Sequence, residues 1–156
     1  MNNKNYWFLG VPIVALLLLI LLFRKEVVLV DYGQGQLFIT SDFTLNWIHS
    51  VEKEPWFEKY RIDEHTLFLE ETYFKTFGAG VPSEGTYIES NDGYIHYAIE
   101  RPVSEVNMMV STNVQVTVYT QNHTIQLYEL VDDYTNVSFS VQRIPLWHYL
   151  RGEKYD

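Results

Sequence analysis

Two kinds of hydrophobic pattern follow one another along the chain. Residues 6–23 form an apolar run without a charged side chain, whereas the remainder largely alternates apolar and polar positions with a period of two. A continuous apolar run of this length is typical of a helix in a nonpolar environment, and alternation is typical of strands with one buried face. The pattern therefore predicts one N-terminal helix followed by a β domain.

The apolar run has the length of a minimal membrane anchor. At about 1.5 Å per residue, a helix over residues 6–23 is about 27 Å long, just enough to span a hydrocarbon core. We expect residues 1–25 to form an uncleaved single-pass anchor. A cleaved signal peptide is the alternative, but no small-residue cleavage site follows the run, and Arg24 and Lys25 come directly after it. The flanking charges differ by one at most, so the positive-inside rule only slightly favours a cytoplasmic domain.

Segments rich in Val, Ile, Thr, Tyr and Phe recur along residues 26–156, and turns with Gly, Asn, Asp or Pro separate most of them. No amphipathic helix of useful length follows the apolar run. We expect the aromatic tail Ile144–Arg151 to pack on an open end of a sheet, with a contact at the membrane interface as the alternative. The sequence predicts an all-β domain, an antiparallel β-sandwich or a small barrel, after one transmembrane helix. The expected strands are Val27–Val30, Gln36–Thr40, Phe43–Val51, Trp56–Ile62, Leu67–Phe77, Thr86–Glu89, Tyr94–Ile99, Val106–Val110, Val114–Tyr119, Thr124–Leu130 and Val137–Gln142.

Loop lengths give a register for the three strands between residues 43 and 77. A two-residue or a four-residue hairpin loop pairs Val51 with Trp56 in the first hairpin. The second connection pairs Ile62 with Leu67 in the same way. These two pairings determine which side chains share each face of the three-stranded meander.

In this register His49 lies beside Glu58, and Glu58 beside Glu71, in one row of the more apolar face. Cross-strand neighbours approach to about 5 Å, which is close enough for hydrogen bonding. Two adjacent carboxylates repel each other unless a proton, a charged imidazole, a lysine or a metal lies between them. We therefore predict a ligand- or cation-binding site at His49, Glu58 and Glu71, completed by Glu52 and Lys53 at the adjacent turn.

Two alternatives remain for this row. It is a buried network that only stabilises the fold, or it is a hydrolase site with His49 as base and Glu58 or Glu71 orienting it. A serine nucleophile at His49-Ser50 is disfavoured, because consecutive strand residues point to opposite faces and cannot share a proton easily. A lone histidine without an HExxH motif predicts no metal, and no other cofactor is expected. We interpret Gly78–Pro82 as a tight bend, with an anion-binding nest as the alternative.

Charge narrows the range of partners. The formal net charge is −9, and residues 26–156 hold all 20 acidic residues and 8 of the 11 basic ones, which leaves −12. A surface this acidic argues against nucleic acid or anionic lipid headgroups as partners of the domain. A cation, a cationic ligand or a basic protein surface suits it better. The absence of cysteine excludes disulfides without fixing the compartment.

Several short motifs occur together in one order, and their combination resembles the domain of unknown function 1850 family over roughly residues 28–125. The motifs are Trp47-Ile48-His49-Ser50-Val51-Glu52, Pro55-Trp56 with Glu58, Glu71-Thr72, Phe77-Gly78-Ala79-Gly80-Val81-Pro82 and Asp92-Gly93-Tyr94. Members are small bacterial proteins, often with an N-terminal signal or anchor. Their genes commonly lie beside those for permeases and solute receptors of tripartite ATP-independent periplasmic (TRAP) transporters. The resemblance supplies no catalytic residues.

The resemblance implies an extracytoplasmic domain with an accessory role in solute transport. It outweighs the small charge difference across the apolar run, so we expect a cell-membrane protein whose C-terminal domain, residues 26–156, lies outside the cytoplasm. The expected partners are a transporter permease, a solute receptor or a small ligand.

Overall fold

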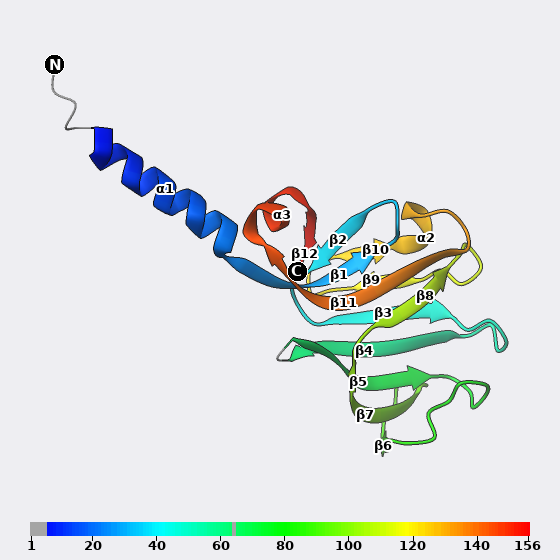
Figure 1. The fold of residues 1–156 in the computed structure, drawn as a ribbon. Coiled ribbons are helices and arrows are strands. Elements are labelled where there is room, and N and C mark those ends of the chain that lie inside the picture. The colour runs from blue at the N-terminus through cyan, green and yellow to red at the C-terminus, as the bar shows by residue number, and fades with distance from the viewer. Residues whose placement is uncertain (1–5, 64) are drawn as a thin grey trace.

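A single helix projects from a β domain in the computed structural model, which describes residues 6–63 and 65–156 (Figure 1). The helix, α1 (Tyr6–Leu22), occupies the apolar run, and residues 1–5 of the expected anchor lie outside the described residues. Val11, Leu16 and Leu22 are among its exposed side chains. Of the helices in the described part of the chain, none combines the length and the apolar character that crossing a membrane requires.

A five-stranded sheet joins the domain to α1. β1 follows the helix directly and pairs with β11 from Arg24 opposite Pro145 to Asp31 opposite Ser138. β12 runs parallel to β2, and the other pairings of this sheet are antiparallel. In spatial order its strands are β12 (Glu153–Tyr155), β2 (Gln36–Ile39), β1 (Arg24–Asp31), β11 (Thr135–Pro145) and β8 (Val106–Val110).

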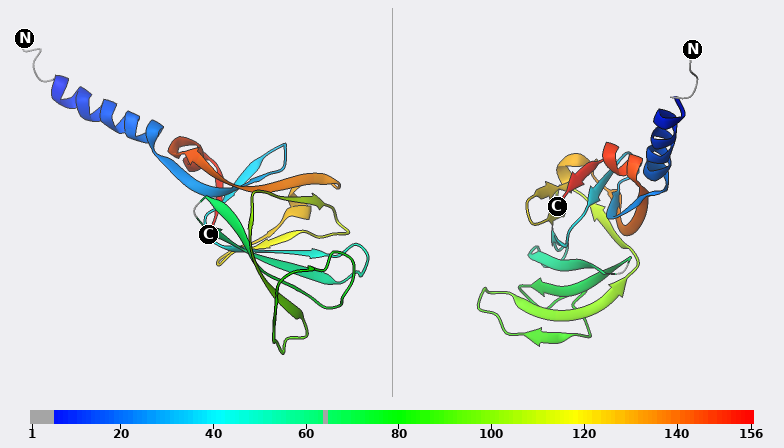
Figure 2. Two further views of the ribbon diagram at one scale, coloured as in Figure 1. Left: turned by 60° about the horizontal axis from the view of Figure 1, so that its bottom comes forward. Right: turned by 90° about the vertical axis from the view of Figure 1, so that its left-hand side faces the viewer.

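The second sheet has seven antiparallel strands and is the wider of the two. Its strands β4, β5, β7 and β6 extend beyond the first sheet, at the end of the domain farthest from α1 (Figures 1 and 2). In spatial order the strands are β10 (Thr124–Gln126), β9 (Thr117–Tyr119), β3 (Phe43–Ile48), β4 (Pro55–Asp63), β5 (Thr66–Phe74), β7 (Ile95–Val103) and β6 (Thr86–Ile88).

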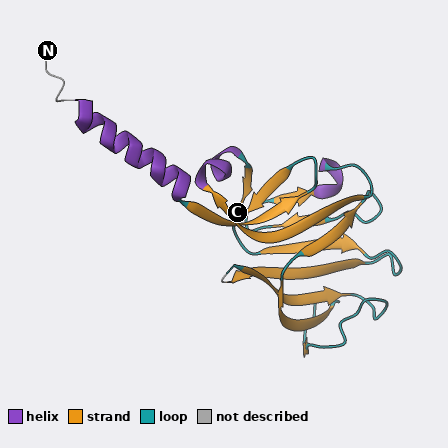
Figure 3. Cartoon of the chain, in the orientation of Figure 1, coloured by secondary structure: helices purple, strands orange, loops and turns teal. Residues whose placement is uncertain are grey.

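The main core lies between the two sheets and is built from alternate residues of their strands. Burying these apolar side chains is the principal force that holds the sheets face to face. The structure therefore confirms a mostly β, sandwich-like domain, as Figure 3 shows. Fully buried members of this core include Val28, Val30, Leu37, Ile39, Leu45, Leu67, Val118 and Phe139.

Two short helices replace predicted strand or coil. The strand expected at residues 124–130 ends at Gln126 and continues as α2 (Leu127–Leu130). The aromatic tail forms α3 (Leu146–Arg151), and its Tyr149 ring stacks on Phe38 with 6.3 Å between the centroids. Phe38 belongs to a small second core separate from the main one, so α3 covers the outer face of the first sheet rather than an open end.

Candidate functional site

The connection between β3 and β4 is longer than the sequence predicts. Trp47, not Val51, lies opposite Trp56, and residues 49–54 form the turn. The His49 amide donates a hydrogen bond to the carbonyl of Glu54 (2.8 Å), and the imidazole stacks on Trp56 with 5.4 Å between ring centroids. The predicted Val51–Trp56 pair is wrong, because hydrogen bonds among residues 49–54 close a longer loop that begins before Val51.

This turn is tied to the glycine-rich segment that follows β5. Glu52 Oε2 contacts His49 Nδ1, and Glu52 Oε1 accepts a hydrogen bond from the Ala79 amide (3.1 Å). A Cβ atom at Gly78 would overlap the Glu52 carboxylate, so only glycine permits this approach. Lys53 is exposed in the turn with φ of 57°, and its amide donates to the His49 carbonyl (3.0 Å).

A β-bulge in β5 separates two of the predicted site residues. Lys59 of β4 lies opposite Glu71, and the next residue, Tyr60, lies opposite Leu69. Glu70 is therefore an extra residue in β5, without a partner in β4. An extra residue reverses the alternation of side chains beyond it. Glu58 therefore lies opposite Thr72 rather than Glu71. The predicted row of His49, Glu58 and Glu71 is not formed.

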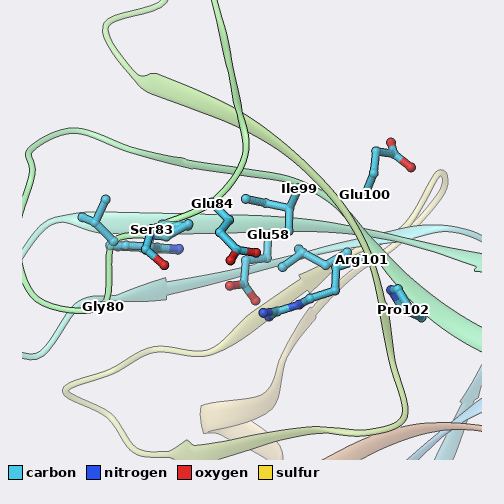
Figure 4. A pocket seen from close by; sticks show the side chains of 12 residues that line it. Glu58, Gly80, Ser83, Glu84, Ile99, Glu100, Arg101 and Pro102 are labelled. Carbon is cyan, nitrogen blue, oxygen red and sulfur yellow. The ribbon is translucent and has the colours of Figure 1, made fainter.

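Glu58 instead faces a cavity of about 620 Å³ on the inner side of β4, β5 and β7. The segment from Gly80 to Glu84, which includes the second half of the glycine bend, forms one wall. Ile99 and Arg101 of β7 contribute to the opposite side (Figure 4). The volume falls within the range of small-molecule sites, about 300–1,000 Å³.

Glu58 is the half-buried acid of this cavity, and the buried Tyr60 hydroxyl donates a hydrogen bond to it. Removal from water raises the pKa of Glu58, although the Tyr60 hydrogen bond and the Arg101 charge act in the opposite direction. Burial, together with the neighbouring Glu58 charge, also raises the pKa of Tyr60. The pair is a hydroxyl and a carboxyl held together in a poorly hydrated corner.

Charges of both signs meet in the cavity. The side chains of Glu58, Glu84 and Arg101 point toward one another from β4, the loop and β7 (Figure 4). Glu84 and Arg101 are exposed, so both can reach a solute that enters from solvent. The arrangement offers two acidic groups and one guanidinium to a single small molecule.

Glu71 belongs to a second polar cluster on the outer face of the same sheet. Lys59 Nζ donates to Glu71 Oε2 (2.5 Å), and Glu71 Oε1 contacts His96 Nδ1. The other imidazole nitrogen lies 3.0 Å from Asp92 Oδ2. His96 is only 8% exposed and stacks on Tyr73 with 4.7 Å between the ring centroids.

The pKa values in this outer cluster follow from its pairing. Burial alone raises the pKa of Glu71, but the hydrogen bonds from His96 and Lys59 outweigh it and hold this pKa below its usual value. Hydrogen bonds from Ser90 and the Tyr94 amide lower the pKa of Asp92. Burial and the Glu71 charge raise the pKa of Tyr73 to about 12. These paired charges fit a structural role better than an open binding site.

The five predicted site residues thus occupy three places. His49, Glu52 and Lys53 share the turn, Glu58 faces the cavity, and Glu71 lies on the opposite face of the sheet. Within residues 6–63 and 65–156, no group of three His, Asp or Glu side chains is arranged to hold a metal ion. The residues that sequence reasoning missed are Tyr60, Glu84, Asp92, His96 and Arg101.

Long-range pairing places Arg101, Glu84 and His96, whereas Tyr60 and Asp92 contact site residues only two to four positions away. Of the five, His96 carried a local signal. It is a histidine within an aromatic strand, directly after the Asp92–Gly93 turn. Arg101 and Glu84 are ordinary surface residues in the sequence, and only folding places them beside Glu58.

The fold and the cavity place the protein in the class of mostly antiparallel two-sheet β-sandwiches, with a polar pocket on the inner face of the wider sheet. The chain belongs to the domain of unknown function family DUF1850, whose model matches residues 43–127, more than half of its length. The match runs from β3 to α2 and includes the turn, the cavity and the outer cluster. Comparisons with curated proteins and with solved structures found no match.

Proposed function

We propose that the domain binds a small polar solute in the cavity beside Glu58 and acts as an accessory protein of a solute transporter. The cavity is the observation that carries this proposal, because its size suits a small molecule and charged groups from three chain segments converge in it. The predicted binding role of Glu58 is retained, and Arg101 and Glu84 take the places that Glu71 and Lys53 had in the sequence-based hypothesis.

The charges indicate the chemistry of the solute. Glu58 and Glu84 suit an ammonium or another cationic group, and the Arg101 guanidinium suits a carboxylate, which it can bind through two parallel hydrogen bonds. A small molecule that carries both groups satisfies all three side chains. A cationic group beside Glu58 also favours the ionised carboxylate, which burial otherwise disfavours.

His49 and Glu52 support the site indirectly. Glu52 holds the Ala79 amide, and the residues that follow, from Gly80 to Glu84, form a cavity wall. Their proposed role is to position this wall, without contact to the solute. This differs from the direct ligand contact that the sequence predicts for them.

Membrane attachment is proposed through α1. Its side chains Val11, Leu16 and Leu21 are 58–61% exposed, an arrangement that favours a nonpolar environment over water. The helix points away from the domain (Figure 1), and the residues that line the cavity all come from positions 56–102. An extracytoplasmic orientation and a TRAP-type permease or solute receptor as partner follow from the family resemblance and belong to this proposal.

Binding is tested with the full-length protein in a nonionic detergent. Isothermal titration against amino acids, dicarboxylates and polyamines should detect a solute that carries both an amine and a carboxylate. Arg101→Gln should weaken binding of that solute at least about tenfold, the cost of one charge-assisted pair. Lys59→Gln is the matched control, because this lysine lies on the other face of β4. Equal weakening in both variants, or no binding by any compound, would contradict the proposed site.

The transport role needs a separate test. Purification from membranes in mild detergent, followed by mass spectrometry, should recover a permease or a solute receptor with the full-length protein. Recovery of neither would rule out a stable complex with a transporter and leave the solute site to stand on the titrations alone.

A further inference from the structure

The short helix α3 turns an apolar surface to solvent. His148 and Tyr149 face inward, where their rings contact Phe38. Trp147 and Leu150, three residues apart and therefore on one side of the helix, are 45% and 60% exposed. The Trp147 ring stacks on His148 (5.6 Å between ring centroids), yet much of its apolar surface and that of Leu150 stays open to water.

This surface continues into the last turn of α1. The Leu146 amide donates a hydrogen bond to the Phe23 carbonyl (2.9 Å), and the two helices are in contact. Leu22 and Phe23 are 75% and 54% exposed. The base of α1 and the outer side of α3 therefore lie next to each other, as Figure 1 shows.

Positive charge gathers at the same place, in a domain that is otherwise strongly acidic. Arg24, Lys25, Arg143 and Arg151 are four of the chain's 11 lysines and arginines, and all four are exposed. Arg24 Nη1 donates to the Arg143 carbonyl (3.2 Å). The Arg151 guanidinium lies 5.9 Å from the centre of the Trp147 ring. Arg151 thus borders the apolar surface at Trp147, and Arg24 and Lys25 directly follow Phe23 in the chain.

We infer that the base of α1 and the outer side of α3 form a docking surface for an anionic lipid bilayer. Trp147 and Leu150 enter the interfacial layer, where the amphipathic ring of tryptophan is favoured, and the four basic side chains contact lipid phosphates. This inference rests on the proposed membrane attachment through α1 and adds the lipid class and the side of the domain that faces the bilayer. It departs from the sequence-based argument against anionic headgroups, which used net charge and not its distribution.

Such docking orients the whole domain. α3 and β6 lie at opposite ends of the molecule (Figure 1). With α3 against the lipid, the β6 end and the neighbouring cavity project away from the bilayer, where a soluble solute or receptor can reach them. Flexible tethering by α1 alone sets no such orientation.

The absence of cysteine allows the contact to be measured at single sites. Full-length Leu150→Cys, labelled with the environment-sensitive fluorophore NBD, is reconstituted into phosphatidylcholine vesicles with and without phosphatidylglycerol. We expect a blue shift and quenching by nitroxide-labelled lipids, both stronger with phosphatidylglycerol. Tyr87→Cys on β6 is the control, since it is exposed at the far end, and its label should behave as in water.

Charge reversal tests the electrostatic part. Arg143→Glu with Arg151→Glu should abolish the additional quenching at position 150 in anionic vesicles, whereas the matched pair Lys53→Glu with Lys75→Glu should preserve it. Vesicle flotation separates the two levels of the hypothesis. A protein that does not float with vesicles contradicts membrane attachment altogether. A protein that floats but shows no quenching at position 150 overturns the α3 docking surface alone.

Discussion

Folding raises the pKa of Glu58 and lowers that of Glu71. The two glutamates therefore change the pH dependence of the free energy of unfolding in opposite ways. The raised pKa of Glu58 means that the folded protein binds more protons than the unfolded chain above about pH 4.5. Its contribution to the free energy of unfolding therefore falls as the pH rises through that window. Glu58→Gln keeps the size and the contact with Tyr60 and should remove this fall. Urea unfolding between about pH 4 and 8 measures the free energy of unfolding of both proteins. If the native protein and Glu58→Gln showed the same dependence on pH, the proposed effect of Glu58 would be contradicted.

Glu71 should show the reverse behaviour. Its lowered pKa contributes stability that is complete above the unfolded pKa and is lost as the pH falls through the folded pKa. Glu71→Gln should lower the free energy of unfolding at neutral pH by about 2 kcal/mol, because Lys59 and His96 lose a charged partner. The same substitution should also make the free energy of unfolding depend less on pH below about pH 4.5. Glu89→Gln, at an exposed position, is the control and should change the free energy of unfolding by less than about 0.5 kcal/mol. If it lost as much as Glu71→Gln, the contacts of Glu71 with Lys59 and His96 would not explain the loss.

At the scale of elements, the sequence predicts strands well and register only where turns are short. The pairing of Ile62 with Leu67 is confirmed, since period-two alternation continues through that hairpin. The predicted β3–β4 register is wrong because residues 49–54 make a six-residue turn. Hydrogen bonds from Thr76 and Ala79, which are 22 and 27 residues away from their partners, hold this turn. The bulge at Glu70 also has no local signal in the sequence. Two consecutive glutamates do not indicate which of them, if either, is the extra residue of a strand.

The contact between the turn and the glycine bend gives a prediction about coupling. Gly78→Ala places a methyl group against the Glu52 carboxylate and should cost about 1–3 kcal/mol of unfolding free energy. In a Glu52→Ala background the obstacle is gone, so the same substitution should cost much less. A double-mutant cycle measured by chemical denaturation isolates this coupling. Additive effects would mean that the bend is positioned by other contacts. Gly10→Ala, in open space on α1, serves as the control.

At the scale of the whole molecule, the sequence correctly separates an apolar helix from an acidic β domain, yet it cannot reveal the cavity. The cavity needs Glu58, the 80–84 segment and Arg101, which meet only when β7 pairs with β5. Composition reports the sum of the charges, whereas function depends on where folding puts them. The basic rim at the base of α1 is invisible in a net charge of −9.

That net charge supports a prediction of its own. Repulsion among like charges destabilises the compact state, and added salt screens it. The melting temperature of the full-length protein in nonionic detergent should therefore rise by about 2–5 °C when NaCl increases from about 10 to 200 mM. A fall would mean that pairs such as Lys59–Glu71 outweigh the general repulsion. The Lys59→Gln variant, which lacks that pair, should show the larger rise.

The extra residue at position 70 makes chain length, more than side-chain chemistry, the critical property of β5. Removing that one residue would restore unbroken alternation along β5 and bring Glu71 to the inner face. Thr72 and Phe74, which are buried, would then point to the surface unless the whole strand shifted. Many substitutions at Glu70 should be tolerated, because its side chain is partly exposed and forms a surface ion pair with Arg61 (3.1 Å). A deletion there should be among the most damaging changes available to this chain. In a library of natural or designed variants, gaps should therefore avoid this position even where the residue itself varies freely.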